Sequence, residues 1–403
     1  MYLKKVVFIL ISFFMFINVS AMDVDTYSKN AVLYNLNDDS VVAEEAKDEI
    51  VSIASMTKIM TTLVALENID DINEKVTLTS EVFKGLKEAN ASVAGFKVGE
   101  KVTYEDLLYG AFLPSGADAT NALAINITGS IDKFVDLMNQ KAKELNLANT
   151  HFSNTTGLDE EDHYSAVNDV AIILKTALKN ETFKEIFLTD KYLTSDKLLT
   201  FTSTLKKSLS AYKISANYIL GGKTGYTLDA GRCLASMAYD EVNDIYYLLV
   251  TANAPTTTGY YHLLDAKNIY EYYFDNYKYF DLIKEGQNIT TIKTKYAKEK
   301  NLNVVSNQNI KKYLKNDFDI SKLEIKYDGV DTVNFNEKVG SKLGTISLVY
   351  EGNTLDSFDT FLNNKLHFSI LAFTKENILI ITISIIILLF VLKPKKKLKH
   401  KRV

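Results

Sequence analysis

The residues best suited to chemistry in this 403-residue chain begin with a serine that has a lysine three positions after it. Ser55 and Lys58 stand at the head of an apolar segment, 59–66, whose spacing predicts a helix. Residues three apart share one helix face, so the lysine amine can reach the serine hydroxyl. A serine becomes a nucleophile when a neighbouring base takes its proton, and lysine can be that base where burial lowers its pKa. The pair alone is weak evidence for a catalytic site. The same spacing recurs at Ser203–Lys206 and Ser210–Lys213, where the sequence predicts no comparable helix start. Considered by itself, Ser55 at the start of a helix is usually an N-cap.

Two further features follow along the chain. Ser115 lies between a proline and a glycine, which predict a sharp turn just before another helix. The run Lys223-Thr224-Gly225 follows two glycines and leads toward an apolar strand, where a lysine and a hydroxyl beside glycine can hold a carboxylate. Each feature also has a purely structural interpretation: a turn serine, and a solvated strand edge that resists aggregation.

In this order, serine-lysine, a serine in a turn and then Lys-Thr-Gly are the signature set of penicillin-interacting serine enzymes. Residues 31–277 resemble the low-molecular-mass penicillin-binding proteins, specifically the D-alanyl-D-alanine carboxypeptidases of peptidase family S11. Three longer runs carry the same resemblance: ASMTKIMTTLVAL at 54–66, the polar loop at 151–165, and GKTGYT through AG at 222–231. The β-rich segment and the apolar C-terminal segment also match the family's usual layout.

The resemblance implies a role for each residue of the first two motifs. Ser55 would form the acyl ester, Lys58 would accept its proton, and Ser115 would relay a proton to the leaving amine. The substrate would be the D-Ala-D-Ala end of a peptidoglycan stem peptide, and β-lactam antibiotics would be covalent inhibitors. Ala117 stands where the middle motif usually has an asparagine that holds the substrate backbone, so this departure concerns substrate affinity more than acylation.

The third motif and one arginine are expected to bind the substrate. Lys223 and Thr224 would hold its terminal carboxylate, Gly225 leaves room for its backbone, and the N–H groups of Ser55 and Tyr226 would form the oxyanion hole. Arg232 is a further candidate, because the chain's other arginine is Arg402 and a guanidinium fits a carboxylate through two hydrogen bonds. Adjacent antiparallel strands would place Arg232 across from Gly225 and Tyr226. A structural ion pair with a nearby acid such as Asp229 is the alternative.

The elements around these motifs predict an α/β (α+β) fold. Strands are expected near both ends of residues 31–277, as hairpins at 31–43 and 234–252, with helices at 55–66, 104–112, 117–125, 131–145, 169–178 and 263–277. This order predicts one sheet flanked by a helical cluster, which the resemblance identifies as a β-lactamase/transpeptidase-like domain. Short strand-like segments then predict a small β-rich domain at 281–366.

Both ends of the chain have the composition of membrane-targeting segments. Residues 1–21 predict a signal peptide, with two lysines, an apolar run and small residues before the expected cleavage site. Residues 377–392 predict a transmembrane anchor, and the basic tail 393–403 is expected on the cytoplasmic side. The peptidase domain, 22–280, would therefore be extracytoplasmic in a single-pass protein of the cell membrane.

The composition of the chain narrows the classes of function that remain possible. A net charge of −4 gives no reason to expect a nucleic-acid partner, and one cysteine excludes an internal disulfide. The five histidines lack metal-binding spacing, so we expect no metal and no cofactor. Three alternatives stay open. A DD-endopeptidase would use the same residues. A class A β-lactamase would need a loop glutamate, for which Glu160 and Glu161 lie in the wrong surroundings. An inactive membrane-tethered wall-binding module is favoured only by Ala117.

Overall fold

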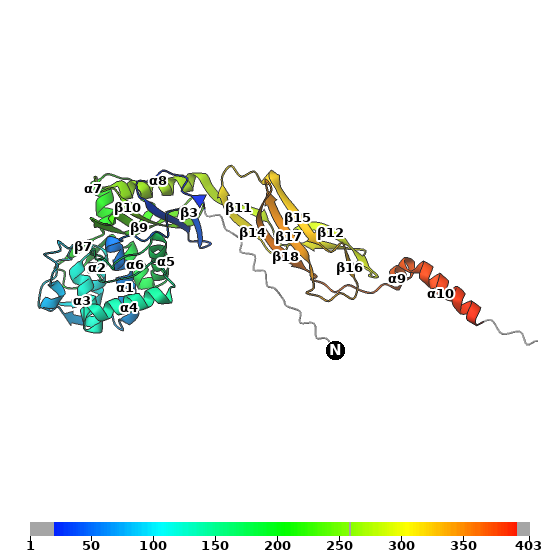
Figure 1. Ribbon diagram of the computed structural model, residues 1–403, viewed down its shortest axis with the longest axis horizontal. Coiled ribbons are helices and arrows are strands. Elements are labelled where there is room, and N and C mark those ends of the chain that lie inside the picture. Colours follow the sequence, from blue (N-terminus) through cyan, green and yellow to red (C-terminus); the bar gives the residue numbers. More distant parts are fainter. Residues whose placement is uncertain (1–19, 258, 393–403) are drawn as a thin grey trace, which may run out of the picture. The chain divides into compact units, whose positions relative to one another are not determined.

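The computed structural model describes residues 20–257 and 259–392, which divide into two compact units between Asp275 and Asn276. The first unit is built on a six-stranded sheet with the order β1-β3-β2-β10-β9-β8 (Figure 1). All neighbouring strands are antiparallel except β1 and β3. The strands are β1 (Ser20–Ala21), β2 (Asn30–Asn35), β3 (Ser40–Glu45), β8 (Ile219–Thr227), β9 (Gly231–Asp240) and β10 (Ile245–Ala254).

Helices cover both faces of this sheet. In Figure 1, α8 runs along one side and the cluster from α1 to α6 lies on the other. The helical elements are η1 (Ala54–Met56), α1 (Thr57–Asn68), η2 (Ser80–Phe83), α2 (Tyr104–Phe112), α3 (Ala117–Thr128), α4 (Ile131–Glu144), α5 (Val167–Ala177), α6 (Glu181–Leu188), α7 (Thr204–Ala211) and α8 (Tyr261–Asn276). Helix α1 is buried without a break from Thr57 to Ala65 and contacts α2, α3, α4, α5 and α6. An apolar helix of this kind belongs in the core, so Lys58 lies on a buried helix, and Ser55 lies in the 3-10 turn η1 that leads into it.

Two short hairpins complete the first unit, β4 (Lys75–Thr77) with β5 (Lys101–Thr103) and β6 (Lys191–Leu193) with β7 (Thr200–Thr202). The helices and hairpins that the hydrophobic pattern predicted are all present, but α6 and α7 were not predicted. The expectation that Ser203 starts no helix is wrong, because its hydroxyl caps α7 by accepting a hydrogen bond from the Lys206 N–H. The N-cap interpretation of Ser55 is also wrong, since Ser55 lies in η1 and Met56 precedes α1.

The second unit is rich in strands. They form a pair, β11 (Tyr277–Ile283) with β14 (Ile310–Lys315), and two three-stranded sheets. One sheet contains β12 (Asn288–Lys295), β13 (Asn301–Val305) and β16 (Thr332–Asn334), and the other β15 (Leu323–Gly329), β17 (Lys342–Tyr350) and β18 (Asn353–Phe361). A 3-10 turn, η3 (Ile320–Lys322), precedes β15. Ile346 and Leu362 are fully buried in the core of this unit. The division expected at 280 falls inside β11.

The chain continues into α9 (Ile370–Glu376) and α10 (Ile378–Val391). The apolar side chains of α10 are almost all exposed. In the described residues no single helix has the length and hydropathy of a membrane span; α9 and α10 pass that test only as a pair, bent by 78°. The predicted signal peptide, apart from Ser20 and Ala21, and the basic tail lie outside the described residues.

Candidate active site

The serine-lysine pair meets directly at the start of α1. The Lys58 amine donates a hydrogen bond of 3.1 Å to the Ser55 hydroxyl and a second one to the carbonyl oxygen of Thr156. Burial lowers the pKa of Lys58 to about 7, although the charge of Asp118 opposes this shift. An amine with this pKa is partly neutral near neutral pH and can take the serine proton.

Ser115, the serine in the turn, belongs to the same site. Ser115 has a φ of +65°, a conformation that is uncommon for a residue with a side chain. Two hydrogen bonds from the residues that follow it hold the turn, from the Gly116 N–H to the Gly110 carbonyl and from the Ala117 N–H to the Ser92 carbonyl. The buried Ser115 hydroxyl therefore has a fixed position before α3, where a strained backbone is a frequent mark of a functional residue.

The lysine of the third motif contacts this serine. Lys223 is fully buried on β8, and its amine donates to the Ser115 hydroxyl at 2.8 Å and to the Thr224 carbonyl at 2.9 Å. Burial, together with the charge of Lys58, holds the pKa of Lys223 well below its ordinary value. Ser55, Lys58, Ser115 and Lys223, which come from three distant segments, thus form one cluster with two buried amines.

Strand β8 passes directly against the turn that carries Ser55. A Cβ added at Gly225 would lie 3.0 Å from the Ala54 Cβ and 3.2 Å from the Ser55 nitrogen. Only a residue without a side chain lets the strand come this close. The hydroxyl of Thr224 is half-buried and hydrogen-bonds that of Thr204 at 2.7 Å, which ties β8 to the start of α7.

The loop before α5 holds Ser55 in place through its neighbour Ala54, which has a φ of +47°. Gly157 packs so tightly that an added Cβ would lie 1.9 Å from the Ala54 carbonyl oxygen. That oxygen accepts a hydrogen bond from the Thr57 hydroxyl, which lies 2.7 Å from His163 Nε2. The Ser153 N–H donates to the other ring nitrogen of His163, so Nε2 carries the proton and donates to Thr57. Burial lowers the pKa of His163 to about 4, which keeps this tautomer neutral.

Arg232 lies on β9 opposite Tyr226 of β8, in the register expected from the sequence. Its guanidinium carbon is 4.8 Å from the centre of the Tyr226 ring, a cation–π distance. Burial and, to a smaller extent, the charge of Arg232 lower the pKa of the buried His262 of α8 to about 4. Tyr226 itself is 48% exposed, so this end of the strand faces solvent.

The buried carboxylate of Asp118 binds the backbone of the segment 92–96. It accepts hydrogen bonds from the N–H groups of Ala94, Gly95 and Phe96, at 2.7, 3.0 and 3.2 Å. This holds the segment 92–96 against the turn of Ser115. Ala117, next to it, is buried and offers no polar side chain to the site.

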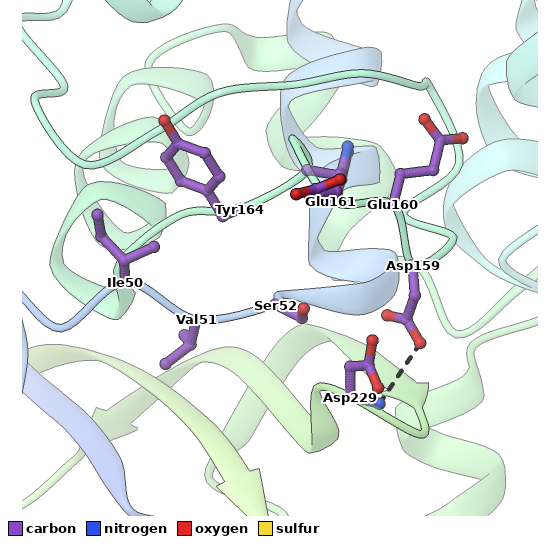
Figure 2. Close-up of a pocket in the computed structure, with 9 residues that line it drawn as sticks. Ile50, Val51, Ser52, Asp159, Glu160, Glu161, Tyr164 and Asp229 are labelled. Carbon is purple, nitrogen blue, oxygen red and sulfur yellow. Dashed lines mark hydrogen bonds between the residues drawn. The ribbon is translucent and has the colours of Figure 1, made fainter.

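An acidic pocket of about 410 Å³ lies beside the loop (Figure 2). Figure 2 shows Asp159 and Asp229 facing one another, where the Asp229 N–H is 3.4 Å from the Asp159 carboxylate. Glu160 and Glu161 are exposed at this pocket and have no hydrogen bond to Ser55 or Lys58 among the described residues. In this chain the loop contributes the Thr156 carbonyl, rather than a glutamate, to the serine-lysine pair.

Comparison with known proteins agrees with this arrangement. Residues 17–256 match the model of the D-alanyl-D-alanine carboxypeptidase family, peptidase S11. The chain belongs to this family. The S11 peptidase is 31% identical over 335 residues to the D-alanyl-D-alanine carboxypeptidase DacF of Bacillus subtilis, covering 81% of this chain and 83% of DacF. A D-alanyl-D-alanine carboxypeptidase of Streptomyces sp. K15 is 34% identical over 206 residues, which are 48% of this chain and 70% of that protein.

Solved structures place the S11 peptidase among transpeptidase-like folds. A mutant of the Streptomyces K15 DD-transpeptidase superposes with a TM-score of 0.56 at 30% identity, over 62% of this chain and 98% of the other. Penicillin-binding protein 5 of Haemophilus influenzae gives a TM-score of 0.63 over 85% of this chain and 98% of the other; at 22% identity this likeness concerns the fold alone.

Proposed function

We propose that this S11 peptidase is a serine-type D-Ala-D-Ala carboxypeptidase that removes the terminal D-alanine from peptidoglycan pentapeptides through an acyl-enzyme on Ser55. The observation that carries the proposal is the cluster in which Lys58 contacts Ser55 and Lys223 contacts Ser115. Family membership supplies the class of reaction. Penicillins, whose ring is opened by the same serine, are expected to inhibit it covalently.

The geometry supports a two-step mechanism. Ser55 Oγ attacks the carbonyl carbon of the scissile amide as Lys58 takes its proton, and the N–H groups of Ser55 and Tyr226 stabilise the oxyanion. The carbon–nitrogen bond then breaks, and Ser115, which is hydrogen-bonded to Lys223, relays the proton that Lys58 has taken up to the leaving amine, so that Lys58 is neutral again. Water finally hydrolyses the ester and restores the Ser55 hydroxyl. Lys223 and Thr224 hold the terminal carboxylate, while Gly225 keeps the strand edge clear for the substrate.

A purified pentapeptide tests this assignment. Mass spectrometry of the products is expected to show the loss of one alanine, and a fluorescent penicillin is expected to label the protein and leave slowly. Rapid release of the label would instead indicate a β-lactamase, and an unlabelled, unreactive protein would indicate an inactive wall-binding module.

The rate of acylation is expected to follow the protonation of Lys58. Only the neutral amine accepts the serine proton, so the second-order rate constant for penicillin labelling should rise about tenfold per pH unit below pH 7 and rise no further above it. Labelling measured from pH 5 to 9 checks this. A rate that keeps rising toward pH 10 would mean that Lys58 has the ordinary lysine pKa of 10.5 and is not the buried base.

Arg232 is proposed to help fix the terminal carboxylate. Arg232→Lys is expected to lower kcat/KM by ~10-fold or more, a loss of at least ~1.4 kcal/mol, because an ammonium cannot reproduce two parallel hydrogen bonds. The control is the same peptide amidated at its C-terminus, on which the loss should be much smaller. Equal losses on the two peptides, or a lowered melting temperature without a kinetic loss, would show that Arg232 only supports the fold.

We also propose that the protein is exported and anchored to the cell membrane by residues 377–392. The support is the exposed apolar surface of α10 and the lysine-rich run after it, which favours the cytoplasmic side. Fractionation checks this: the full chain should sediment with membranes, and a chain ending at Glu376 should not. Equal sedimentation of both would contradict the anchor.

A further inference from the structure

One peptide group, between Ala54 and Ser55, lies between the loop before α5 and the edge of β8. Two glycines show how this group is oriented. A Cβ added at Gly157 of the loop would overlap the Ala54 carbonyl oxygen. A Cβ added at Gly225 of β8 would lie 3.2 Å from the Ser55 nitrogen. The oxygen therefore faces the loop, and the nitrogen faces the strand beside Tyr226, whose N–H is the other proposed oxyanion donor.

The two ends of this peptide group cannot be oriented independently. A peptide group is planar and trans, so its C=O and its N–H point in opposite directions. Any contact that holds the Ala54 oxygen therefore also sets the direction of the Ser55 N–H. Ala54 needs such support, because a φ of +47° is uncommon for a residue with a side chain and persists only where the surroundings impose it.

The Ala54 oxygen is held by Thr57, the first residue of α1. It accepts the Thr57 N–H and a 2.8 Å hydrogen bond from the buried Thr57 hydroxyl. A hydroxyl has one hydrogen, which can rotate toward different acceptors. Here His163 Nε2 donates to the Thr57 oxygen at 2.7 Å, so the hydroxyl hydrogen has to point away from the ring and toward Ala54.

The histidine in turn has a fixed orientation. The Ser153 N–H donates to His163 Nδ1 at 3.1 Å, which leaves the proton of the neutral ring on Nε2. The ring is 3% exposed and packs edge-on against Phe152, with the ring centres 5.8 Å apart. Two backbone hydrogen bonds between Ser165 and Val51 hold the chain just after it. A directed series of three hydrogen bonds thus runs from the loop to the Ala54 carbonyl.

We propose that His163 and Thr57 are positioning residues for the oxyanion hole. Through the Ala54 carbonyl they fix the direction of the Ser55 N–H, which stabilises the developing oxyanion. The proposal rests on the acyl-enzyme function stated above and assigns roles to two further side chains of that site. Both act through a peptide group rather than through the substrate, so they govern the rate of acylation more than the affinity for the ligand.

The test measures penicillin acylation of the full-length protein in detergent with two pairs of variants. Thr57→Val keeps the shape of the side chain without its hydroxyl, and Thr57→Ser keeps the hydroxyl. His163→Asn can still accept the Ser153 N–H but lacks a donor at the place of Nε2, and His163→Gln has an amide N–H that reaches it. The first variant of each pair should therefore be slow, and the second should recover most of the wild-type rate.

The size of the effect follows from what an oxyanion donor contributes. Losing one donor costs ~10²–10³ in rate, so misdirecting one is expected to slow acylation about 10- to 50-fold in Thr57→Val and His163→Asn. The penicillin concentration that gives half the maximal rate should change by no more than about twofold, because binding before the reaction is preserved. All rates are measured well below the lowest melting temperature of the set.

A transition-state analogue gives a readout that a general structural defect would not reproduce. A peptide boronic acid adds to the Ser55 hydroxyl, and one oxygen of the tetrahedral adduct occupies the oxyanion hole. Its affinity should fall in each variant by about the same factor as the acylation rate, since such analogues report the binding of the transition state. Affinity for the product tetrapeptide, which forms no adduct, should stay nearly constant.

Thr61→Val is the matched control. Thr61 is buried one turn further along α1, and its hydroxyl donates to the Thr155 carbonyl of the same loop at 2.8 Å. This variant should lose stability and acylate at the wild-type rate. The proposal is overturned if Thr57→Val or His163→Asn acylates as fast as the wild type, if Thr61→Val is equally slow, or if boronate affinity is unchanged where acylation falls. A wild type that takes no penicillin label on Ser55 would instead overturn the carboxypeptidase function itself.

Discussion

Replacing Ser55 with alanine is expected to abolish both penicillin labelling and release of D-alanine while leaving the fold intact. Its hydroxyl accepts a hydrogen bond from the Lys58 amine and is the group that forms the acyl ester in the proposed mechanism. Removing it costs little in stability, because Ser55 is neither a helix cap nor fully buried. Intact-protein mass spectrometry after incubation with penicillin measures the labelling, and a thermal melt measures whether the fold is intact.

Ser203→Ala is the matched control, because Ser203 also has a lysine three positions later but serves as the N-cap of α7. It should keep the label and lose ~1 kcal/mol of stability, as caps do. A label that persists in Ser55→Ala, or that moves to Ser203 or Ser210, would show that the nucleophile has been misassigned.

Gly157→Ala is expected to reduce acylation by at least ~100-fold and to lower the melting temperature. The new Cβ would fall 1.9 Å from the Ala54 carbonyl oxygen and 2.9 Å from the Thr57 hydroxyl, so the backbone under Ser55 must move. Displacements of ~1 Å near reacting groups can cost ~100-fold in rate. The measurement is the rate of penicillin labelling at a temperature well below the melting point of the variant.

A substitution at a second glycine serves as the control that distinguishes the effect of the steric clash from the effect of backbone strain. Gly99 has a φ of +82°, close to the +80° of Gly157, but no atom lies within 4 Å of its added Cβ. Gly99→Ala should therefore lose stability from strain alone and keep its labelling rate. If the two variants label equally fast, Gly157 does not position Ser55.

The parts of the site that the sequence predicted depend on local patterns. The spacing of Ser55 and Lys58 on an apolar helix and the pairing of Arg232 with Tyr226 follow from helix and strand periods, and the structure has both contacts. The hydrophobic runs also predicted the large elements of the sheet and the helical cluster. Helices α6 and α7 are only eight residues long, too short for a strong periodic signal, and were missed.

Other parts depend on tertiary contacts that no spacing reveals. The Thr156 carbonyl reaches Lys58 across 98 positions of sequence, and His163 reaches Thr57 across 106. Gly157 lies close to Ala54 because the two backbones pack together. The only indication of this contact in the sequence is a single glycine inside a polar loop.

The two buried amines of the proposed catalytic cluster are expected to couple substrate binding to proton exchange with the solvent. Because burial and the charge of Lys58 hold the pKa of Lys223 well below the ordinary value, its amine in the empty enzyme holds its proton less firmly than an ordinary lysine does. A carboxylate that binds there favours the charged amine and raises its pKa, so binding is coupled to the uptake of protons from the buffer. The heat of binding will then depend on the ionisation enthalpy of the buffer, and affinity for the free-acid peptide will fall as the pH rises.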